Sequence, residues 1–207
     1  ELHNSLRNKT YRHGRYQEFY VSDPKRRHIH KAPVYDRIIH RLLYKYLYEL
    51  FDKSFIYDSY SCRLKKGTHR AVKRLESFSR KLSKNYTRNF WALKLDIKKF
   101  FESVDHKILM NLIRTKVKDK DIIWLTQNVI DSFEVKKSKG IPLGNLTSQI
   151  FANIYLNEVD QFVKHRLRIK YYIRYADDFM FLSRNKTPLF PCIDTSQQFL
   201  KENLKLE

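Results

Sequence analysis

Two adjacent carboxylates stand in the part of the chain whose residue types are best suited to chemistry. Residues 171–183 read YYIRYADDFMFLS, so two short aromatic and aliphatic runs flank Asp177 and Asp178. The pattern predicts a β-hairpin with both aspartates at its tight turn. Neighbouring carboxylates repel each other, and holding them between apolar strands is costly unless a cation neutralises them. A solvated Asp-Asp turn is the simpler alternative.

A third aspartate upstream favours a cation-binding site over a solvated turn. In residues 89–106 apolar side chains alternate with others, which predicts a strand with Asp96 near its end, on the face opposite the apolar stripe. If this strand pairs with the hairpin, three carboxylates converge. Three carboxylates offer hard oxygen ligands but do not fill the coordination shell of an ion. This suits Mg²⁺, which keeps coordination positions for water and phosphate oxygens. Two such ions can stabilise the attacking and leaving oxygens of a phosphoryl displacement.

These motifs resemble a known family. The YADD segment ending at Asp178, with Asp96 in the context DIKKFF, resembles the palm active site of reverse transcriptases. Group II intron and retroviral enzymes usually carry Gln and Pro where this chain has Leu143 and Gln149. The form GNLTSQ is instead similar to the reverse transcriptases of diversity-generating retroelements. The resemblance runs from about Tyr16 to the last residue.

The resemblance implies an α+β fold, that of the fingers and palm of a right-hand polymerase, in which the palm is an antiparallel sheet backed by helices. We expect fingers over residues 1–92 and palm over 93–207, with a fingers excursion at about 106–140. The chain starts without Met and stops where the family's palm continues, so we expect the thumb to be missing from this chain. Without a thumb, we expect a weak grip on primer–template and an inactive fragment.

The resemblance also assigns the chemistry. Asp96, Asp177 and Asp178 are the expected catalytic residues, and together with the backbone carbonyl of Ile97 they are the expected metal ligands. The expected cofactor is a pair of Mg²⁺ ions, for which Mn²⁺ can substitute. The primer 3′-hydroxyl would attack the α-phosphate of the incoming nucleotide.

Further residues are expected to bind substrate. Lys25 and Arg27, on a basic hairpin that matches the fingers, could clamp the β- and γ-phosphates; a solvated basic turn is the alternative. Phe101 lies where the family carries the side chain below the sugar, and a ring there excludes a ribose 2′-hydroxyl; its alternative is a core position.

The loop before the helix at about 147–167 is expected to cover the nucleotide. Gly144 permits close backbone approach, and Leu143 offers no hydrogen bond where relatives place an amide, which predicts reduced fidelity. Ser148 and Gln149 either orient the template base or cap the helix.

Composition identifies the partner class. The chain of 207 residues carries 42 Lys and Arg against 22 Asp and Glu, a net charge of +20, which favours nucleic acid. No apolar run suggests a membrane span and no segment suggests secretion, so we expect a cytoplasmic protein without membrane contact. The expected partners are an RNA template, a DNA or RNA primer, dNTPs and a small basic accessory protein.

Neither the two cysteines nor the scattered histidines have the spacing of a zinc site. We attribute the alternation of His28 and His30 to the two faces of a strand.

Periodicity and capping residues predict the elements. The first is a β-hairpin over 17–31 broken at Asp23-Pro24. A helix over 33–53 follows, with an apolar stripe of Val34, Ile38, Leu42, Tyr46 and Leu50 widened by Ile39, Leu43 and Leu47. Next come a helix capped by Thr68 with Ala71, Val72 and Leu75 inward, a loose connection over 77–89, a helix over 106–117 capped by Asp105, and a helix over 119–132. The helix from Thr147 or Ser148 and a last helix capped at Asp194-Thr195 and ending near Leu204 complete the chain.

The leading functional hypothesis is error-prone, RNA-templated DNA synthesis in a diversity-generating retroelement. Another bacterial reverse transcriptase, of a defence-associated, intron or orphan lineage, is the first alternative. A non-catalytic RNA-binding module is a second, although clustered carboxylates beside a polyanion argue against it. An RNA-dependent RNA polymerase is a weaker competitor, against which Phe101 discriminates.

Overall fold

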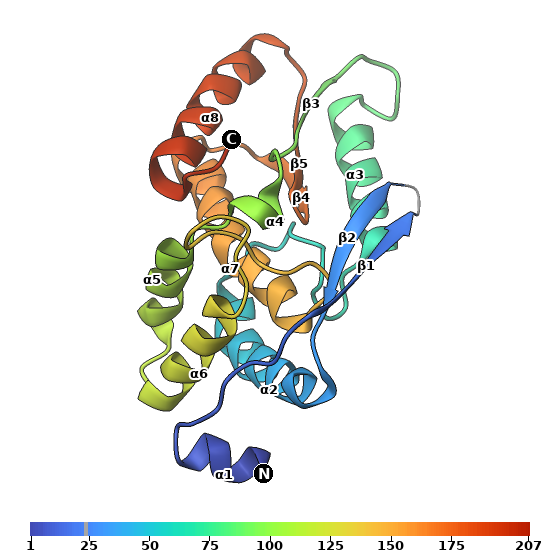
Figure 1. Cartoon of the computed structure of the whole chain (residues 1–207). Coiled ribbons are helices and arrows are strands. Elements are labelled where there is room, and N and C mark those ends of the chain that lie inside the picture. Colours follow the sequence, from blue (N-terminus) through green and yellow to red (C-terminus); the bar gives the residue numbers. More distant parts are fainter. Residues whose placement is uncertain (23–24) are drawn as a thin grey trace. The chain divides into compact units, whose positions relative to one another are not determined.

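The computed structural model describes residues 1–22 and 25–207, so the predicted break at Asp23-Pro24 lies outside the described residues. Its elements in chain order are α1 (Leu2–Arg7), β1 (Gln17–Ser22), β2 (Arg26–Lys31), α2 (Val34–Phe51), η1 (Asp52–Ser54), α3 (Thr68–Leu82), β3 (Trp91–Leu95), α4 (Phe100–Ser103), α5 (His106–Lys116), α6 (Lys120–Asp131), α7 (Leu146–Gln161), η2 (Phe162–Arg166), β4 (Tyr171–Tyr175), β5 (Asp178–Ser183), η3 (Thr187–Leu189) and α8 (Phe190–Leu204). This mixture of helices and antiparallel strands confirms the predicted α+β class (Figure 1). Among the described residues, no helix combines the length and the apolar character needed to cross a bilayer.

The chain divides into two packing units. The hairpin unit comprises Glu1–Phe51 and Phe101–Phe151, and the sheet unit comprises Asp52–Phe100 and Ala152–Glu207. The division falls within α4 and within α7.

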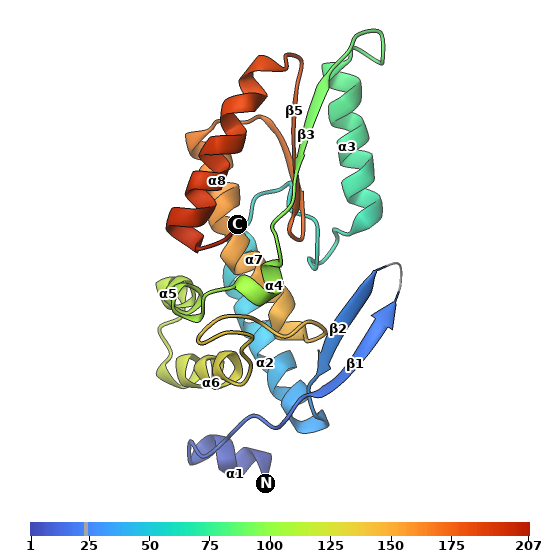
Figure 2. The ribbon, with the colours of Figure 1, turned by 45° about the horizontal axis from the view of Figure 1, so that its top comes forward.

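The sheet unit is built on three antiparallel strands in the order β3-β5-β4. The predicted hairpin and its pairing with the strand before Asp96 are therefore confirmed. Helix α3 lies along one side of the sheet and α8 along the other (Figure 2). Directly paired residues share a face, so the sheet presents two distinct surfaces to these helices.

The α3 side of the sheet is closed by an apolar cluster. Its buried members are Tyr60, Ala71, Phe78, Leu82, Ile173 and Leu182. Because Phe78 and Leu82 belong to it, α3 continues as a helix to Leu82, and the predicted loose connection over 77–89 is wrong for its first residues. The apolar surface that they bury favours order over a loop conformation.

The start of α3 also differs from prediction. Gly67 is the N-cap, and Thr68 is the first helical residue, whose hydroxyl is hydrogen-bonded to the Tyr175 hydroxyl at 2.9 Å. Val72, predicted to face inward, is exposed. Ala71 and Leu75, also predicted to face inward, do pack in the cluster. Val72 differs from the adjacent Ala71 because two successive positions are about 100° apart around a helix.

Helix α8 ends at Leu204, close to the predicted position, but begins earlier than predicted. Its first turn contains Pro191, whose missing N–H costs nothing where no intrahelical acceptor exists. Thr195 therefore lies inside the helix, with its hydroxyl donating to the Pro191 carbonyl at 2.6 Å, and the predicted cap at Asp194-Thr195 is wrong.

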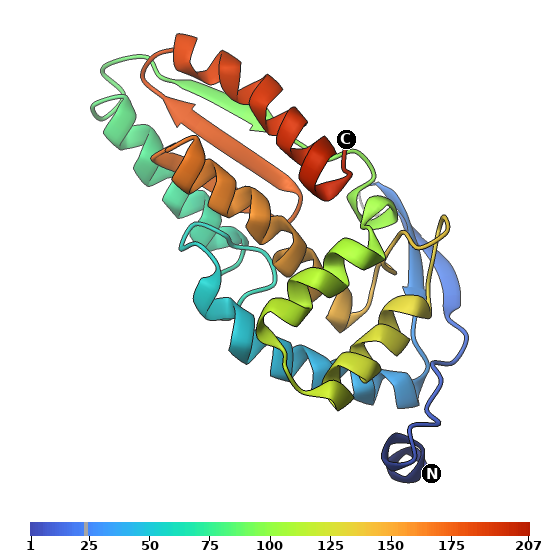
Figure 3. The same cartoon turned by 90° about the vertical axis from the view of Figure 1, so that its left-hand side faces the viewer.

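In the hairpin unit, β1 and β2 form a two-stranded antiparallel ribbon, as predicted. Helices α5 and α6 lie side by side (Figure 3), and α5 begins at the predicted cap Asp105. The Asp105 carboxylate accepts from the Ile108 amide, and the Asp119 carboxylate accepts from the amides of Asp121 and Ile122.

Helix α2 buries the residues that widen the predicted stripe, Ile39, Leu43 and Leu47, rather than the line that begins at Val34. The buried side chains are Asp36, Ile39, His40, Leu43, Leu47 and Phe51. The first three residues of the predicted stripe, Val34, Ile38 and Leu42, are exposed. Polar partners explain why the face with Asp36 is the buried one. The Asp36 carboxylate accepts from the Tyr11 hydroxyl at 2.6 Å and from the Gly14 amide at 3.0 Å.

His40 makes the hairpin unit sensitive to acid. Its ring nitrogens lie 2.5 Å from the Thr147 hydroxyl and 3.0 Å from Nε2 of His13. Burial, then the nearby His13 charge, lower the pKa of His40 to about 4. Between that value and about 6.5, the unfolded chain binds a proton that the folded chain excludes, so stability falls as pH falls through this window.

We expect the stability advantage of the wild type over His40→Gln to shrink by about 2 kcal/mol between about pH 7.5 and about pH 5. Urea unfolding at several pH values measures it. His69→Gln, at an exposed histidine, is the control and should follow the wild type. Parallel wild-type and His40→Gln curves would contradict the expectation.

Candidate active site

The three aspartates meet at one end of the sheet. Leu95, the last residue of β3, pairs with Phe179 of β5. Asp96 follows Leu95 and Asp178 precedes Phe179, so the same antiparallel register places these two carboxylates opposite each other. Asp177 is the second residue of the two-residue turn that joins β4 to β5.

The acidic turn has a strained backbone. Tyr175 pairs with Asp178, which leaves Ala176 and Asp177 as the loop residues. Ala176 has φ of 54°, in the region that favours glycine and that costs an L-residue roughly 1 to 2 kcal/mol. Its carbonyl accepts a hydrogen bond from Arg174 Nη1 at 3.0 Å, which holds the turn in this conformation.

Lys94 lies among the three carboxylates. Its ammonium nitrogen is 2.8 Å from Oδ1 of Asp178. This hydrogen bond, then the charge of Asp178 and the charges of Asp96 and Asp177, raise the pKa of Lys94. One cation therefore experiences the field of all three groups. Both side chains are substantially exposed, so the lysine can move aside at little cost.

The donor set fits a hard divalent ion. Asp96, Asp177 and Asp178 offer carboxylate oxygens, the ligands that Mg²⁺ prefers, and Lys94 shows that the site attracts positive charge. The buried Ile97 follows Asp96 and would supply a backbone carbonyl. The three carboxylates are not within 4.8 Å of one another as a group, so holding one ion requires their side chains to rotate toward it.

A buried ion pair supports the acidic turn from inside the sheet unit. Arg174 on β4 and Asp160 on α7 are both fully excluded from solvent and form a two-pronged pair at 2.8 and 2.7 Å. Tyr172 donates its hydroxyl to the same carboxylate at 2.7 Å. The remaining Arg174 donors reach Asn153, Ser59 and the Ala176 carbonyl.

This network keeps its charges. Burial alone lowers the pKa of Arg174, but the Asp160 carboxylate outweighs it, and Asp177 adds to the effect, so the pKa lies above its ordinary value. Burial and Asp160 raise the pKa of Tyr172. A guanidinium with every donor engaged is tolerated in the interior, whereas one left unpaired is not.

The other residues expected at the site belong to the hairpin unit. Lys25 and Arg27 are exposed, and Arg27 pairs with Val21 in the ribbon. Phe101 is half-buried in α4, and its carbonyl accepts from the Ile141 amide at 2.7 Å. Phe100, the preceding residue, is a core residue of the sheet unit.

The loop before α7 is fastened to β2. The His30 amide donates to the Leu143 carbonyl at 2.9 Å, and the Asn145 side chain donates to the His30 carbonyl at 2.7 Å. Gly144 has φ of 108°, and a Cβ there would lie 2.7 Å from Cγ2 of Ile29. Glycine is therefore required by the contact with β2 itself.

The first turn of α7 separates two expected residues. Ser148 is buried and donates to the Pro142 carbonyl at 2.6 Å, which ties the loop to the helix, while Gln149 is exposed. Asn145, Lys94 and Arg174 were not predicted from the sequence as residues of the site. For Arg174, a cation alternating with apolar residues on an otherwise buried strand was the available signal.

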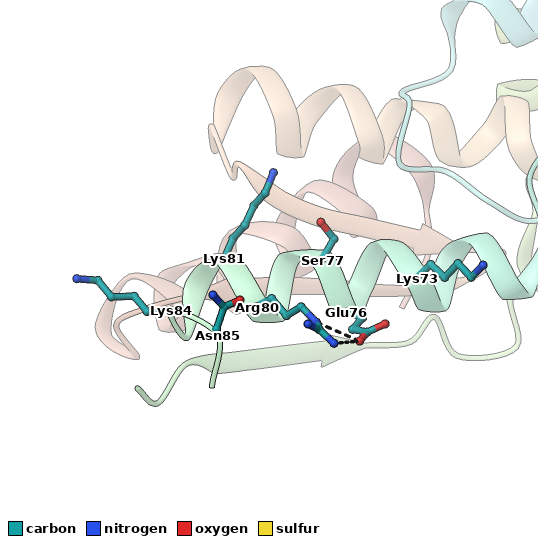
Figure 4. Close-up of a pocket in the computed structure, with 7 residues that line it drawn as sticks. All are labelled: Lys73, Glu76, Ser77, Arg80, Lys81, Lys84 and Asn85. Atoms are coloured by element: carbon teal, nitrogen blue, oxygen red, sulfur yellow. Dashed lines mark hydrogen bonds and ion pairs between the residues drawn. The ribbon is translucent and has the colours of Figure 1, made fainter. Parts of the chain in front are cut away.

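Helix α3 carries a basic surface on the sheet unit. An open hollow along its outer side is lined by Lys73, Glu76, Ser77, Arg80, Lys81, Lys84 and Asn85 (Figure 4). Arg80 is paired with Glu76 at 2.8 Å, and the lysines leave an excess of positive charge. Such a surface suits the phosphate backbone of a nucleic acid.

Comparison with known proteins identifies the family. The family model described as reverse transcriptase (RNA-dependent DNA polymerase) matches residues 22–207, and the chain belongs to this family. Protein YkfC of Escherichia coli K12 is 26% identical over 137 residues, 63% of this chain and 35% of YkfC. The group II intron-encoded protein LtrA of Lactococcus lactis subsp. cremoris is 28% identical over 142 residues, 66% of this chain and 22% of LtrA.

Solved structures agree on the fold. Apo telomerase from Candida tropicalis, truncated from its C-terminal domain, superposes with a TM-score of 0.64 at 17% identity, covering 94% of this chain and 48% of the telomerase chain. Telomerase from Candida albicans with a fragment of telomeric RNA gives 0.66 at 10% identity, covering 97% and 42%. The chain thus has a reverse transcriptase fold and spans about a third or less of these curated relatives.

The buried pair leads to a stability prediction. Arg174→Met strands the Asp160 carboxylate in the interior, and we expect it to cost about 3 to 5 kcal/mol in the free energy of unfolding. Adding Asp160→Leu should recover part of this loss, because no buried charge then remains unpaired. Urea unfolding measures both variants.

Arg80→Met is the matched control, because Arg80 forms an exposed pair with Glu76. Its cost should be small beside that of Arg174→Met, because an exposed ion pair is screened by solvent and contributes little to stability. Equal losses in Arg174→Met and Arg80→Met would show that the network does not hold the sheet unit together.

Proposed function

We propose that the protein containing this chain is an RNA-directed DNA polymerase that copies an RNA template into DNA, as part of a diversity-generating retroelement. The observation that carries the proposal is the meeting of Asp96, Asp177 and Asp178 at one end of a sheet in a chain of the reverse transcriptase family. Two Mg²⁺ ions, when bound there, supply activation of the primer 3′-hydroxyl and neutralisation of the triphosphate.

Each residue has a defined task in this proposal. Asp96, Asp177 and Asp178, with the Ile97 carbonyl, hold the ions, and Lys94 moves away from Asp178 when they bind. Arg174 keeps the acidic turn in place through the Ala176 carbonyl.

In the hairpin unit, Lys25 and Arg27 bind the β- and γ-phosphates. Phe101 excludes a ribose 2′-hydroxyl and so selects dNTPs. Gly144 and Leu143 lie against the nucleotide, and Gln149, exposed on the first turn of α7, contacts the template base.

The positive charge supports an RNA template as partner. The net charge is +20, and the basic surface of α3 offers lysines to a phosphate backbone. One structural neighbour is a telomerase in complex with a fragment of telomeric RNA. A non-catalytic RNA-binding module is disfavoured, because three carboxylates at one place repel a polyanion.

The retroelement assignment rests on the GNLTSQ form of residues 144–149. A second candidate is an intron-type enzyme, favoured by the similarity to the group II intron-encoded protein LtrA. The two differ in products, since a retroelement enzyme would make DNA with errors concentrated opposite template adenines.

Primer extension on an RNA template tests the proposal, with the full-length protein that contains this chain and with Mg²⁺ present. We expect DNA from dNTPs and little product from NTPs. Asp177→Asn should lower the rate by at least about 100-fold, because it removes an ion ligand. The product sequences then separate the retroelement type from more accurate lineages.

The control is Asp194→Asn, at an exposed carboxylate of α8, which should extend primers normally. RNA binding by Asp177→Asn should remain, which separates a loss of chemistry from a loss of template. Normal extension by Asp177→Asn would refute the assignment of the active site.

The side chain at position 143 tests the fidelity part of the proposal. Leu143→Gln restores one hydrogen bond, worth about 1 kcal/mol, and we expect errors opposite template adenines to fall by about fivefold. Sequencing of the cDNA measures this. Val135→Gln, at an exposed apolar residue of the same unit, should leave the error spectrum unchanged. An unaltered spectrum in Leu143→Gln would remove Leu143 from the account.

A further inference from the structure

The ribbon formed by β1 and β2 brings together three metal-ligating side chains. In its register Glu18 lies opposite His30, and Tyr20 lies opposite His28. Opposed residues, and residues two apart on one strand, share a face, so Glu18, His28 and His30 project from the same side of the ribbon. One ring nitrogen of each histidine and one Glu18 oxygen all lie within 4.8 Å of one another.

The spacing fits a tetrahedral transition-metal ion. Nε2 of His28 lies 3.2 Å from Oε2 of Glu18. Zinc bonds of about 2.0 to 2.1 Å to nitrogen and oxygen give an edge of about 3.3 Å between two ligands in a tetrahedron. Nδ1 of His30 is buried and has no hydrogen-bond partner within the described residues, so this ring has unused ligand capacity.

The donor types separate this cluster from the aspartate site. Two imidazoles and one carboxylate match zinc centres that keep a fourth position for water, whereas Mg²⁺ prefers oxygen ligands throughout. Among the groups of the described chain that could hold a metal through three or more side chains, this is the one whose ligand atoms lie close enough.

Neighbouring rings fix the two imidazoles. The Tyr20 ring is stacked on His28, with centroids 4.6 Å apart and planes 11° apart. The Phe133 ring packs edge-on against His30 at 4.6 Å. Side chains already held in place lose little conformational entropy when an ion binds, which favours a site over a chance cluster.

We propose that Glu18, His28 and His30 bind a divalent transition-metal ion, best matched by Zn²⁺, that cross-links β1 to β2. An isolated two-stranded ribbon is marginally stable in water, and an ion that binds only the paired state stabilises it. The same ribbon carries Arg27 and, through the His30 amide, holds the Leu143 carbonyl. The metal site does not rest on the proposed polymerase function.

The test is titration of the full chain with Co²⁺ and then Zn²⁺, with excess Mg²⁺ present to occupy the aspartates. We expect one Co²⁺ per chain with the visible absorbance of a tetrahedral complex, and its displacement by Zn²⁺. His28→Gln, His30→Gln and Glu18→Gln should each lower the affinity by at least about 10-fold. His69→Gln, at an exposed histidine, should bind as the wild type does.

Thermal unfolding provides the second measurement. Zn²⁺ should raise the melting temperature of the wild type and of His69→Gln, but not that of His28→Gln. Glu18→Gln changes an exposed side chain and keeps its shape, so it remains informative if a histidine variant folds poorly. Zinc affinity that is equal in the wild type and Glu18→Gln, or absent from the wild type, would show that the cluster is only a stacked and ion-paired surface.

Discussion

The sheet unit depends on one buried ion pair, that between Arg174 and Asp160. Both groups lie wholly out of solvent, where an ion pair is tolerable only if its remaining hydrogen-bonding capacity is used. The guanidinium meets this condition by also reaching Ser59, Asn153 and the Ala176 carbonyl. One side chain thus joins α7, the segment after η1 and the acidic turn, so the position of Asp177 is set by the core of the unit.

Two cations offset the negative charge of the carboxylates, one held rigidly and the other free to move. Arg174 approaches from the interior and is held by its partners, and its pKa responds to Asp177. Lys94 approaches from the exposed side and contacts Asp178. The fixed cation lowers the repulsion between adjacent carboxylates permanently, while the mobile one can leave when a stronger cation arrives. The interior and the surface of the sheet unit therefore each supply one positive charge to the acidic turn.

The sequence predicted what depends on local pattern. Alternation predicted the strand before Asp96, and the apolar runs predicted the hairpin around Asp177 and Asp178. Long-range contacts decided the rest. The buried face of α2 was predicted only in part, because Asp36 and His40 are polar yet satisfied by partners far along the chain. The approach of Glu18 to His28 depends on strand register, which alternation alone does not specify.

In the loop before α7, some residues attach the loop to β2 through their side chains and others through their backbone. Gly144 is required because a Cβ would strike Ile29, and Asn145 is required because its amide pairs with the backbone of β2. Leu143 contributes its backbone carbonyl to the same attachment. Its side chain can therefore change without loosening the loop, unlike those of its neighbours. A position where the backbone makes the structural contact leaves the side chain free to vary, so the proposed role of Leu143 in fidelity requires no change in how the loop is held.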